Sequence, residues 1–326
     1  VDALLTSLDN DFFILLDNVT IARSRRHIEK FYKNTNVGKF PTRLKPKSLR
    51  PDLTDLNDLG FDDVAELMYR LNLKVYTPLE FVHPSRLAKY VDLDSRQGAS
   101  WQNRETGRNQ LMMSNLLKRL ESSIHSFRIT SQNILVLINN ALKQIENYEK
   151  GIDQRYQIEE FGGDDFDAEE LGEETVGKEL RISIADMDYT QWRERLLEDK
   201  AIFQDMLTRT AGIEGMHDLK LAELKREIRE KIHNPINDHN KKVVIFTAFA
   251  NTADYLYDEI KDWAKREFGL NSAVVTGSSN PRTTLSGIRA DFNDVLTCFS
   301  PISKNRDLVM SANAGDIDIL IATDCI

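Results

Sequence analysis

The chain has 326 residues, of which 41% are hydrophobic and 29% charged, and its formal net charge is −9. This composition is typical of a globular protein, and no apolar run reaches the roughly 18 residues that span a bilayer. Cys298 and Cys325 lie in no CxxC pair and the histidines add no ligand spacing, which argues against a zinc site or a disulfide scaffold and favours a reducing cytoplasm. The chain has neither a signal-peptide pattern nor an initiator Met, so we expect its start to lie inside a longer gene product.

The net charge hides two opposed local stretches. Nine acidic residues without a Lys or Arg lie between Glu159 and Glu174, and they account for the whole net charge. The window from Arg23 to Arg50 carries ten cations against Glu29 and nets +9. A polyanionic partner is therefore compatible with this chain, because a local basic stretch decides such binding and the global balance does not.

The first 60 residues mix short helices with proline-rich stretches. Residues 6–17 predict a short helix, residues 19–22 an extended stretch, and Ser24 is a suitable N-cap for a helix to Tyr32. The prolines at positions 41, 46 and 51 predict irregular or extended chain over 41–60. Apolar residues at helical spacing then predict a helix near 62–71.

Residues 106–148 predict one long helix or two. Apolar side chains recur there at three- and four-residue steps and form one stripe, which helices around 192–208 and 218–232 could cover. Between these helices, residues 157–178 combine glycines with the acidic run and predict a mobile loop or insertion. The functional alternative for this segment is an acidic mimic of DNA that inhibits its own motor.

After Asn240 the pattern changes to alternating strands and helices. Strands are expected over 242–247, 272–276 and 317–322, with a helix over 251–268 and another that carries Leu285 to Leu296. This alternation predicts a parallel α/β sheet, whose ligands bind beyond the carboxyl ends of the strands. The residues at those ends are Thr247, Thr276, Gly277, Thr323 and Asp324.

Several of these segments resemble superfamily-two helicases. Residues 243–247 (Val-Val-Ile-Phe-Thr) and 252–256 (Thr-Ala-Asp-Tyr-Leu) resemble motif IV. Residues 274–277 (Val-Val-Thr-Gly) resemble the strand and turn after it, and 318–324 (Asp-Ile-Leu-Ile-Ala-Thr-Asp) resemble the start of motif V.

Other segments resemble the chromatin-remodeller-like (sucrose-non-fermenting type) branch. Residues 22–25 and 40–43 resemble its paired "RRxK" and "LPxK" segments at the exit from the first RecA-like domain. Residues 217–221 resemble its "GKL" element. Segments 116–123 and 299–304 look like bacterial members with a large helical insert, which suggests a role with the bacterial nucleoid.

The resemblance implies an α/β fold with a large helical region, mostly α-helical at first and followed by an incomplete RecA-like parallel domain. Residues 1–60 would be the exit of the first RecA-like domain. Residues 61–235 would be a helical insert or linker containing the acidic loop 157–178. Residues 236–326 would be a truncated second RecA-like domain, ending within motif V.

The resemblance further implies ATP and Mg²⁺ as cofactors of the full-length protein and DNA as its partner. This sequence contains no GxxxxGK[ST] phosphate loop and no Asp-Glu-x-His box, and residues 36–39 (Asn-Val-Gly-Lys) lack the required neighbours. The arginine of motif VI, which stabilises the transferring phosphate, would also lie elsewhere. We therefore expect nucleotide binding mainly by the missing first domain, and no ATP hydrolysis by this chain alone.

The resemblance assigns phosphate contacts to the strand ends. Thr247 and Thr323 would hold one DNA strand through hydroxyl and backbone N–H groups, in a sequence-independent way. Thr276 and Gly277 would form a turn that a phosphate can approach, and Asp324 would couple the DNA side to the ATP cleft. The alternatives are that the threonines and Asp324 cap helices and that Gly277 is an ordinary turn residue.

Four cations are further candidates for phosphate contact. Arg23 and Arg26 would share a helical face while Arg25 points elsewhere, and Lys304 and Arg306 lie on an open loop near the rim of the sheet. The alternative for the arginines is a solvated face or an interdomain salt bridge. Lys118 and Arg119 lie in the apolar stripe beside Glu121, where pairing with carboxylates is expected.

The leading hypothesis is a fragment of an ATP-dependent DNA helicase or double-strand DNA translocase. The alternative is a non-catalytic scaffold, a degenerate RecA-like half domain with helices that bind protein partners. No membrane partner is expected. The strand over 317–322 should be central, so an incomplete sheet would leave an apolar edge open to self-association.

Overall fold

The computed structural model describes residues 40–56, 59–91, 101–152, 155–157, 181–277, 279–310 and 315–323. The chain divides into two units, one formed by 1–47 with 235–240 and the other by 48–234 with 241–326. The expected helices at 6–17 and 24–32 lie outside the described residues, as do Arg23, Arg25, Arg26, Asp324 and nearly all of the acidic loop 157–178.

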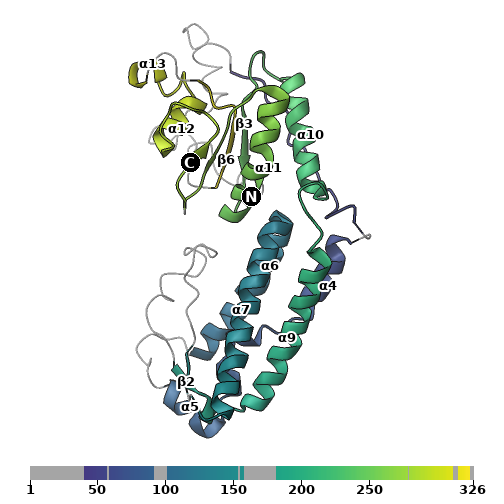
Figure 1. Ribbon diagram of the computed structural model, residues 1–326, viewed down its shortest axis with the longest axis vertical. Coiled ribbons are helices and arrows are strands. Elements are labelled where there is room, and N and C mark those ends of the chain that lie inside the picture. Colours follow the sequence, from purple (N-terminus) through teal and green to yellow (C-terminus); the bar gives the residue numbers. More distant parts are fainter. Residues whose placement is uncertain are drawn as a thin grey trace, which may run out of the picture. The chain divides into compact units, whose positions relative to one another are not determined.

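The first part of the larger unit is mainly helical (Figure 1). Its helices are α4 (Phe61–Tyr69), η1 (Lys74–Tyr76), η2 (Pro78–Phe81), α5 (Pro84–Val91), α6 (Trp101–Ser122), α7 (Ile124–Glu149), η5 (Ile184–Asp186), α9 (Tyr189–Thr210) and α10 (Leu219–His233). A short antiparallel pair, β1 (Arg155–Gln157) and β2 (Arg181–Ser183), lies between α7 and η5. Within the described ranges, no helix is both long and apolar enough to cross a membrane.

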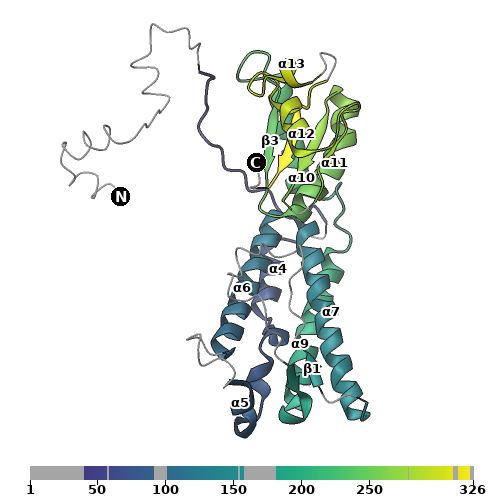
Figure 2. The ribbon, with the colours of Figure 1, turned by 90° about the vertical axis from the view of Figure 1, so that its left-hand side faces the viewer.

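The stripe over 106–148 forms two helices, because Ser123 interrupts it. The backbone of Ser123 is extended, and its hydroxyl accepts a hydrogen bond from the N–H of Ser126 at 3.1 Å, which caps α7. The chain turns back at this residue, so α6 and α7 pack against one another and α7 also packs against α9 (Figure 2). The apolar stripe is thus covered as expected, with Phe127, Trp192 and Phe203 fully buried in the shared core.

Buried carboxylates hold the connection between α4 and α5 against the long helices. Asp199 on α9 accepts hydrogen bonds from the N–H groups of Asn72 and Lys74, and the indole of Trp192 donates to the carbonyl of Lys74. Both oxygens of Glu105 on α6 accept from the N–H of Leu79, at 3.2 and 3.1 Å. These bonds satisfy backbone groups that the short 3₁₀ turns leave open, which explains why two carboxyl groups are buried in a largely apolar core.

The second part of the larger unit is a four-stranded mixed sheet between helices. Its elements are β3 (Val243–Phe246), α11 (Ala250–Phe268), β4 (Ser272–Val275), β5 (Arg282–Thr283), α12 (Phe292–Phe299), α13 (Arg306–Val309) and β6 (Ile319–Ala322). The strand order is β3-β6-β4-β5, with β6 parallel to both β3 and β4 and with β5 antiparallel to β4. Helices α10 and α11 cover one face and α12 covers the other (Figure 1).

The helix that was expected to carry Leu285 to Leu296 begins only at Phe292. Gly287 has a φ of 86° and breaks the helix before it can form. Asp291 then caps α12 by accepting a hydrogen bond from the N–H of Asp294 at 2.8 Å. Leu285 and Ile288 still pack against the core on the α12 side, so their periodicity reflected burial in a loop.

Strand β6 is central, as expected, and both of its edges are paired. The two outer edges of this sheet therefore belong to β3 and to the two-residue strand β5. Val244 is 43% exposed and Phe246 65% exposed, whereas Val243 and Ile245 pack on the α11 side of the sheet. Strand β3 thus presents an apolar side to solvent along its free edge.

Candidate nucleic-acid interface at the carboxyl edge of the sheet

The structure brings the three predicted threonines to one edge of the sheet. Phe246 and Val275 are both in register with Ala322, so the residue after each strand lies at the same carboxyl edge. The N–H of Thr247 donates to the carbonyl of Ala322 at 3.0 Å, and the N–H of Thr323 donates to the carbonyl of Val275 at 3.2 Å. These backbone hydrogen bonds fix the positions of Thr247 and Thr323. Together with Thr276, these residues form a row of three threonines across neighbouring strands.

Thr276 stabilises the turn that follows β4. Its hydroxyl lies 2.7 Å from the hydroxyl of Ser279 and accepts a hydrogen bond from the N–H of Ser279 at 3.2 Å. Gly277 lies exposed in the same bend, while Thr276 is 7% exposed. The hydroxyl of Thr276 thus shapes the turn, and the exposed Gly277 leaves the backbone there open to a ligand.

Thr247 contacts the helical region as well as its own strand end. Its hydroxyl accepts a hydrogen bond from the N–H of Phe249 at 3.3 Å and lies 3.4 Å from the hydroxyl of Ser122. Thr252, in the first turn of α11, lies 2.9 Å from Ser122 and 3.0 Å from Ser123, measured between hydroxyl oxygens. The turn between α6 and α7 therefore reaches the carboxyl end of β3 through a cluster of four hydroxyl groups.

Arg119 of α6 also contributes to the junction between the α6–α7 turn and the start of α11. It is 2% exposed, its guanidinium lies 4.5 Å from the ring centroid of Phe249, and its Nη1 donates to the hydroxyl of Ser126 at 3.2 Å. A cation over an aromatic face contributes about 2 kcal/mol when desolvated. Arg119 thus packs against Phe249, the N-cap residue that precedes α11.

A second junction joins the start of α10 to α11. Asp218 caps α10 by accepting from the N–H of Leu221, and its other oxygen accepts from the hydroxyl of Tyr255 at 2.8 Å. The ring of Tyr255 stacks on His125 of α7 with centroids 5.0 Å apart. Burial and the neighbouring Asp218 raise the pKa of Tyr255, so its phenol stays protonated and remains a donor. Burial also lowers the pKa of His125.

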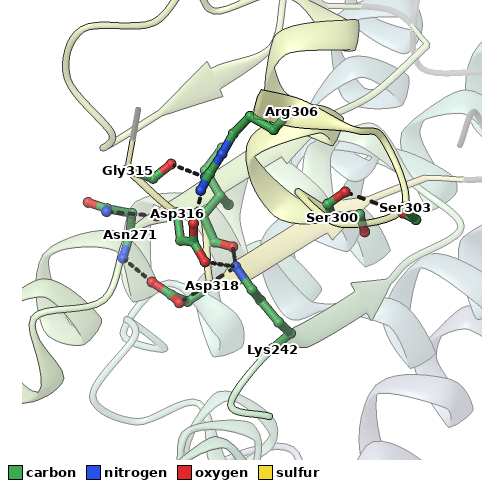
Figure 3. A network of polar contacts seen from close by, with 9 residues as sticks. Lys242, Asn271, Ser300, Ser303, Arg306, Gly315, Asp316 and Asp318 are labelled. Carbon is green, nitrogen blue, oxygen red and sulfur yellow. Dashed lines mark hydrogen bonds and ion pairs between the residues drawn. The ribbon is translucent and has the colours of Figure 1, made fainter. Parts of the chain in front are cut away.

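The opposite edge of the sheet carries an ion-pair network that includes Arg306 (Figure 3). Arg306 Nη1 lies 2.6 Å from one oxygen of Asp316 and also donates to the carbonyl of Gly315. Lys242 Nζ lies 3.0 Å from the other oxygen of Asp316 and donates to the carbonyl of Ile317. Burial alone would raise the pKa of Asp316, but the hydrogen bonds from Arg306 and Lys242 lower it.

This network lies at the amino ends of the strands. Lys242 precedes β3, Asp316 and Asp318 precede β6, and the N–H of Asn271, which precedes β4, donates to Asp318. The expectation of an open Arg306 is therefore wrong, since Arg306 is tied to Asp316 at the edge that faces away from the threonines. Lys304 lies exposed in the preceding turn.

Of the described candidates, Thr247, Thr276, Gly277 and Thr323 lie at the carboxyl edge of the sheet, whereas Arg306 lies at the opposite edge. Among the described residues, no group of three or more His, Cys, Asp or Glu side chains is placed to hold a metal ion. The hydroxyl cluster with Ser122 and Ser123 escaped sequence reasoning, although adjacent serines in an apolar helical stripe were a visible signal. Comparisons with protein-family models, with curated proteins and with solved structures found no significant match to this chain.

Proposed function

We propose that this chain is part of an ATP-dependent DNA helicase or double-strand DNA translocase of the chromatin-remodeller-like branch of superfamily two. In this proposal the sheet of β3, β6, β4 and β5 belongs to a second RecA-like domain. The chain supplies nucleic-acid phosphate contacts and one side of the ATP cleft, while a first RecA-like domain binds most of the ATP and Mg²⁺.

The contact between segment 116–123 and the start of α11 carries this proposal. Ser122 and Thr252 lie 130 residues apart in the chain, yet their hydroxyl groups are 2.9 Å apart. Segments 116–123 and 252–256 each resemble superfamily-two proteins in their own sequence. Segment 217–221 adds a second such contact, in which the hydroxyl of Tyr255 donates to Asp218. Contact among these three segments within one unit supports the proposal.

The threonine edge has the chemistry that phosphate binding requires. Hydroxyl groups at strand ends can contact phosphate oxygens without reading bases, which suits a motor that moves over any sequence. The N–H groups of Thr247 and Thr323 already donate within the sheet, so the proposed contact uses the hydroxyl groups. Closure of the two RecA-like domains around ATP would shift this grip along one strand. Asp324, which follows Thr323, would couple the DNA contacts to the ATP cleft.

The rate of DNA-stimulated ATP hydrolysis by the full-length gene product tests the proposal. We expect the paired variant Thr247→Val with Thr323→Val to lower the DNA-stimulated rate about tenfold or more, which corresponds to roughly 1.4 kcal/mol of transition-state stabilisation. Thr208→Val is a matched control, because the Thr208 hydroxyl bonds only the carbonyl of Gln204 on the exposed face of α9. Its rate should stay within about twofold of the parent.

Two outcomes would contradict the proposal. One is a full-length protein that folds but shows no DNA-dependent nucleotide hydrolysis, which would favour the non-catalytic scaffold. The other is clear ATP hydrolysis by residues 1–326 alone, since this sequence holds no phosphate loop.

A further inference from the structure

Residues 41–50 form an exposed stretch without helix or strand, which Figure 2 shows in purple without helical turns. Pro41 and Pro46 each fix their own backbone near a φ of about −65° and restrict the preceding residue to extended conformations. These restrictions favour an extended backbone for residues 41–47, the last part of the smaller unit before its boundary. We call residues 41–47 the basic segment.

Cations occupy every second position of the basic segment from Arg43 onward. Arg43, Lys45 and Lys47 are exposed, and the segment contains no Asp or Glu. At a rise of about 3.1–3.4 Å per residue, these charges follow one another at about 6–7 Å along the chain. The described part of the smaller unit also contains one acidic residue, Asp238. The result is a short linear array of positive charge.

The amide of Asn237 fixes the basic segment in place. Its oxygen accepts from the N–H of Thr42 at 2.7 Å, and its nitrogen donates to the carbonyl of Thr42 at 3.1 Å. One side chain thus satisfies both backbone groups of Thr42, as a neighbouring strand would. This anchor lies directly before Arg43, so it orders the cationic array before any partner binds and reduces the entropy lost on binding.

We propose that Arg43, Lys45 and Lys47 form a track for the phosphates of a nucleic-acid strand. The proposal rests on the proposed function in taking nucleic acid as the polyanion. A linear array of cations suits a linear array of phosphates, and guanidinium and ammonium groups are the side chains that contact phosphates most often. The track contacts the backbone only, so it binds without sequence preference and raises affinity in a salt-dependent way.

A salt titration of the whole chain tests the track directly. Fluorescence anisotropy of labelled duplex DNA gives the slope of log K against log salt. We expect Arg43→Gln, Lys45→Gln and Lys47→Gln together to reduce the steepness of this slope by about 2.7 for duplex DNA, or by about 2.1 for a single strand, at three phosphates neutralised. Asn237→Ala keeps every cation but removes the anchor of Thr42. We expect this variant to bind DNA several-fold more weakly, with a slope of log K against log salt within about 0.9 of the parent value.

The control triple variant removes the same charge from exposed helical surfaces. Lys150→Gln, Arg195→Gln and Arg209→Gln each remove a cation that already pairs with a carboxylate one helical turn away. This variant should keep the parent slope. An unchanged slope in the Arg43, Lys45 and Lys47 variant would overturn the track, as would a parent chain that binds anionic lipid vesicles but no DNA.

The two proposals fail in different ways. Loss of DNA-stimulated ATP hydrolysis in the threonine variants, with a normal slope in the track variant, would sustain the motor and overturn the track. A full-length protein without ATP hydrolysis whose track variant still loses salt dependence would overturn the motor and sustain the track.

Discussion

The hydroxyl of Thr252 lies within 3.0 Å of the hydroxyls of both Ser122 and Ser123. Thr252 belongs to the first turn of α11, and the two serines form the turn between α6 and α7. Thr252 is 2% exposed, so water cannot replace these contacts. The helical region and the strand-end threonines are therefore connected by hydrogen bonds whose loss should be measurable.

The substitution Thr252→Val removes this connection while keeping the side-chain shape. We expect the free energy of unfolding to fall by about 1–3 kcal/mol, because the serine hydroxyls lose a buried partner. Urea unfolding followed by circular dichroism measures the change. Thr208→Val, whose hydroxyl is exposed, should cost no more than about 0.5 kcal/mol. Equal effects of the two substitutions would show that the junction contributes nothing specific.

The buried Glu105 makes the stability of the helical region depend on pH. Burial raises the pKa of Glu105 to about 8, against the lowering effect of the N–H of Leu79. A carboxyl group whose folded pKa exceeds its unfolded value favours folding below the unfolded pKa, and this contribution is lost as pH rises through the folded value. We expect the parent protein to lose on the order of 4 kcal/mol between about pH 4.5 and about pH 8 from this group alone.

The substitution Glu105→Gln tests this effect. The neutral amide keeps an oxygen that accepts from Leu79 and has no charge to bury. Unfolding free energies at about pH 5.5 and about pH 8.5 should therefore differ less in the variant than in the parent. Glu149→Gln provides a control, because Glu149 pairs with Arg193 at a half-exposed position. A parent protein with the same pH dependence as Glu105→Gln would refute the assignment.

Local patterns predicted β3, β4, β6, the long helices and the threonine edge, because these features depend on short-range periodicity and on the geometry of parallel sheets. They did not predict the short strands β1, β2 and β5, and the last of these makes the expected parallel sheet a mixed one. The turn at Ser123 was left open as one helix or two, since an apolar stripe continues across a capped break. The start of α12 was misplaced because Leu285 and Ile288 repeat at helical spacing inside a loop. The Ser122–Thr252 and Arg306–Asp316 contacts depend on tertiary packing, which no local pattern encodes.

Arg306 should stabilise the fold and leave DNA binding unaffected. We expect Arg306→Gln to lower the free energy of unfolding by about 1 kcal/mol, a modest value because Asp316 is 45% exposed and screening weakens the pair. The salt dependence of DNA binding should stay unchanged. Lys304 is itself a candidate phosphate contact, so Lys304→Gln should leave the free energy of unfolding unchanged and reduce the slope by about 0.9. A lower slope in Arg306→Gln would restore the arginine as a DNA contact.

The free edge of β3 should promote self-association of residues 1–326. The N–H groups of Val243 and Thr247 donate to Asp318 and Ala322, before and within β6, so the backbone groups of Val244 and Phe246 point toward the free edge. An exposed apolar edge of this kind templates pairing with another strand, and a lysine on it opposes such pairing. Light scattering across a concentration series should show a rising mean mass for the parent chain and a smaller rise for Phe246→Lys. Leu308→Lys, at a residue 84% exposed outside the sheet, should behave as the parent does. A parent chain that stays strictly monomeric at the highest concentration would show that the twist and shortness of β3 already protect this edge.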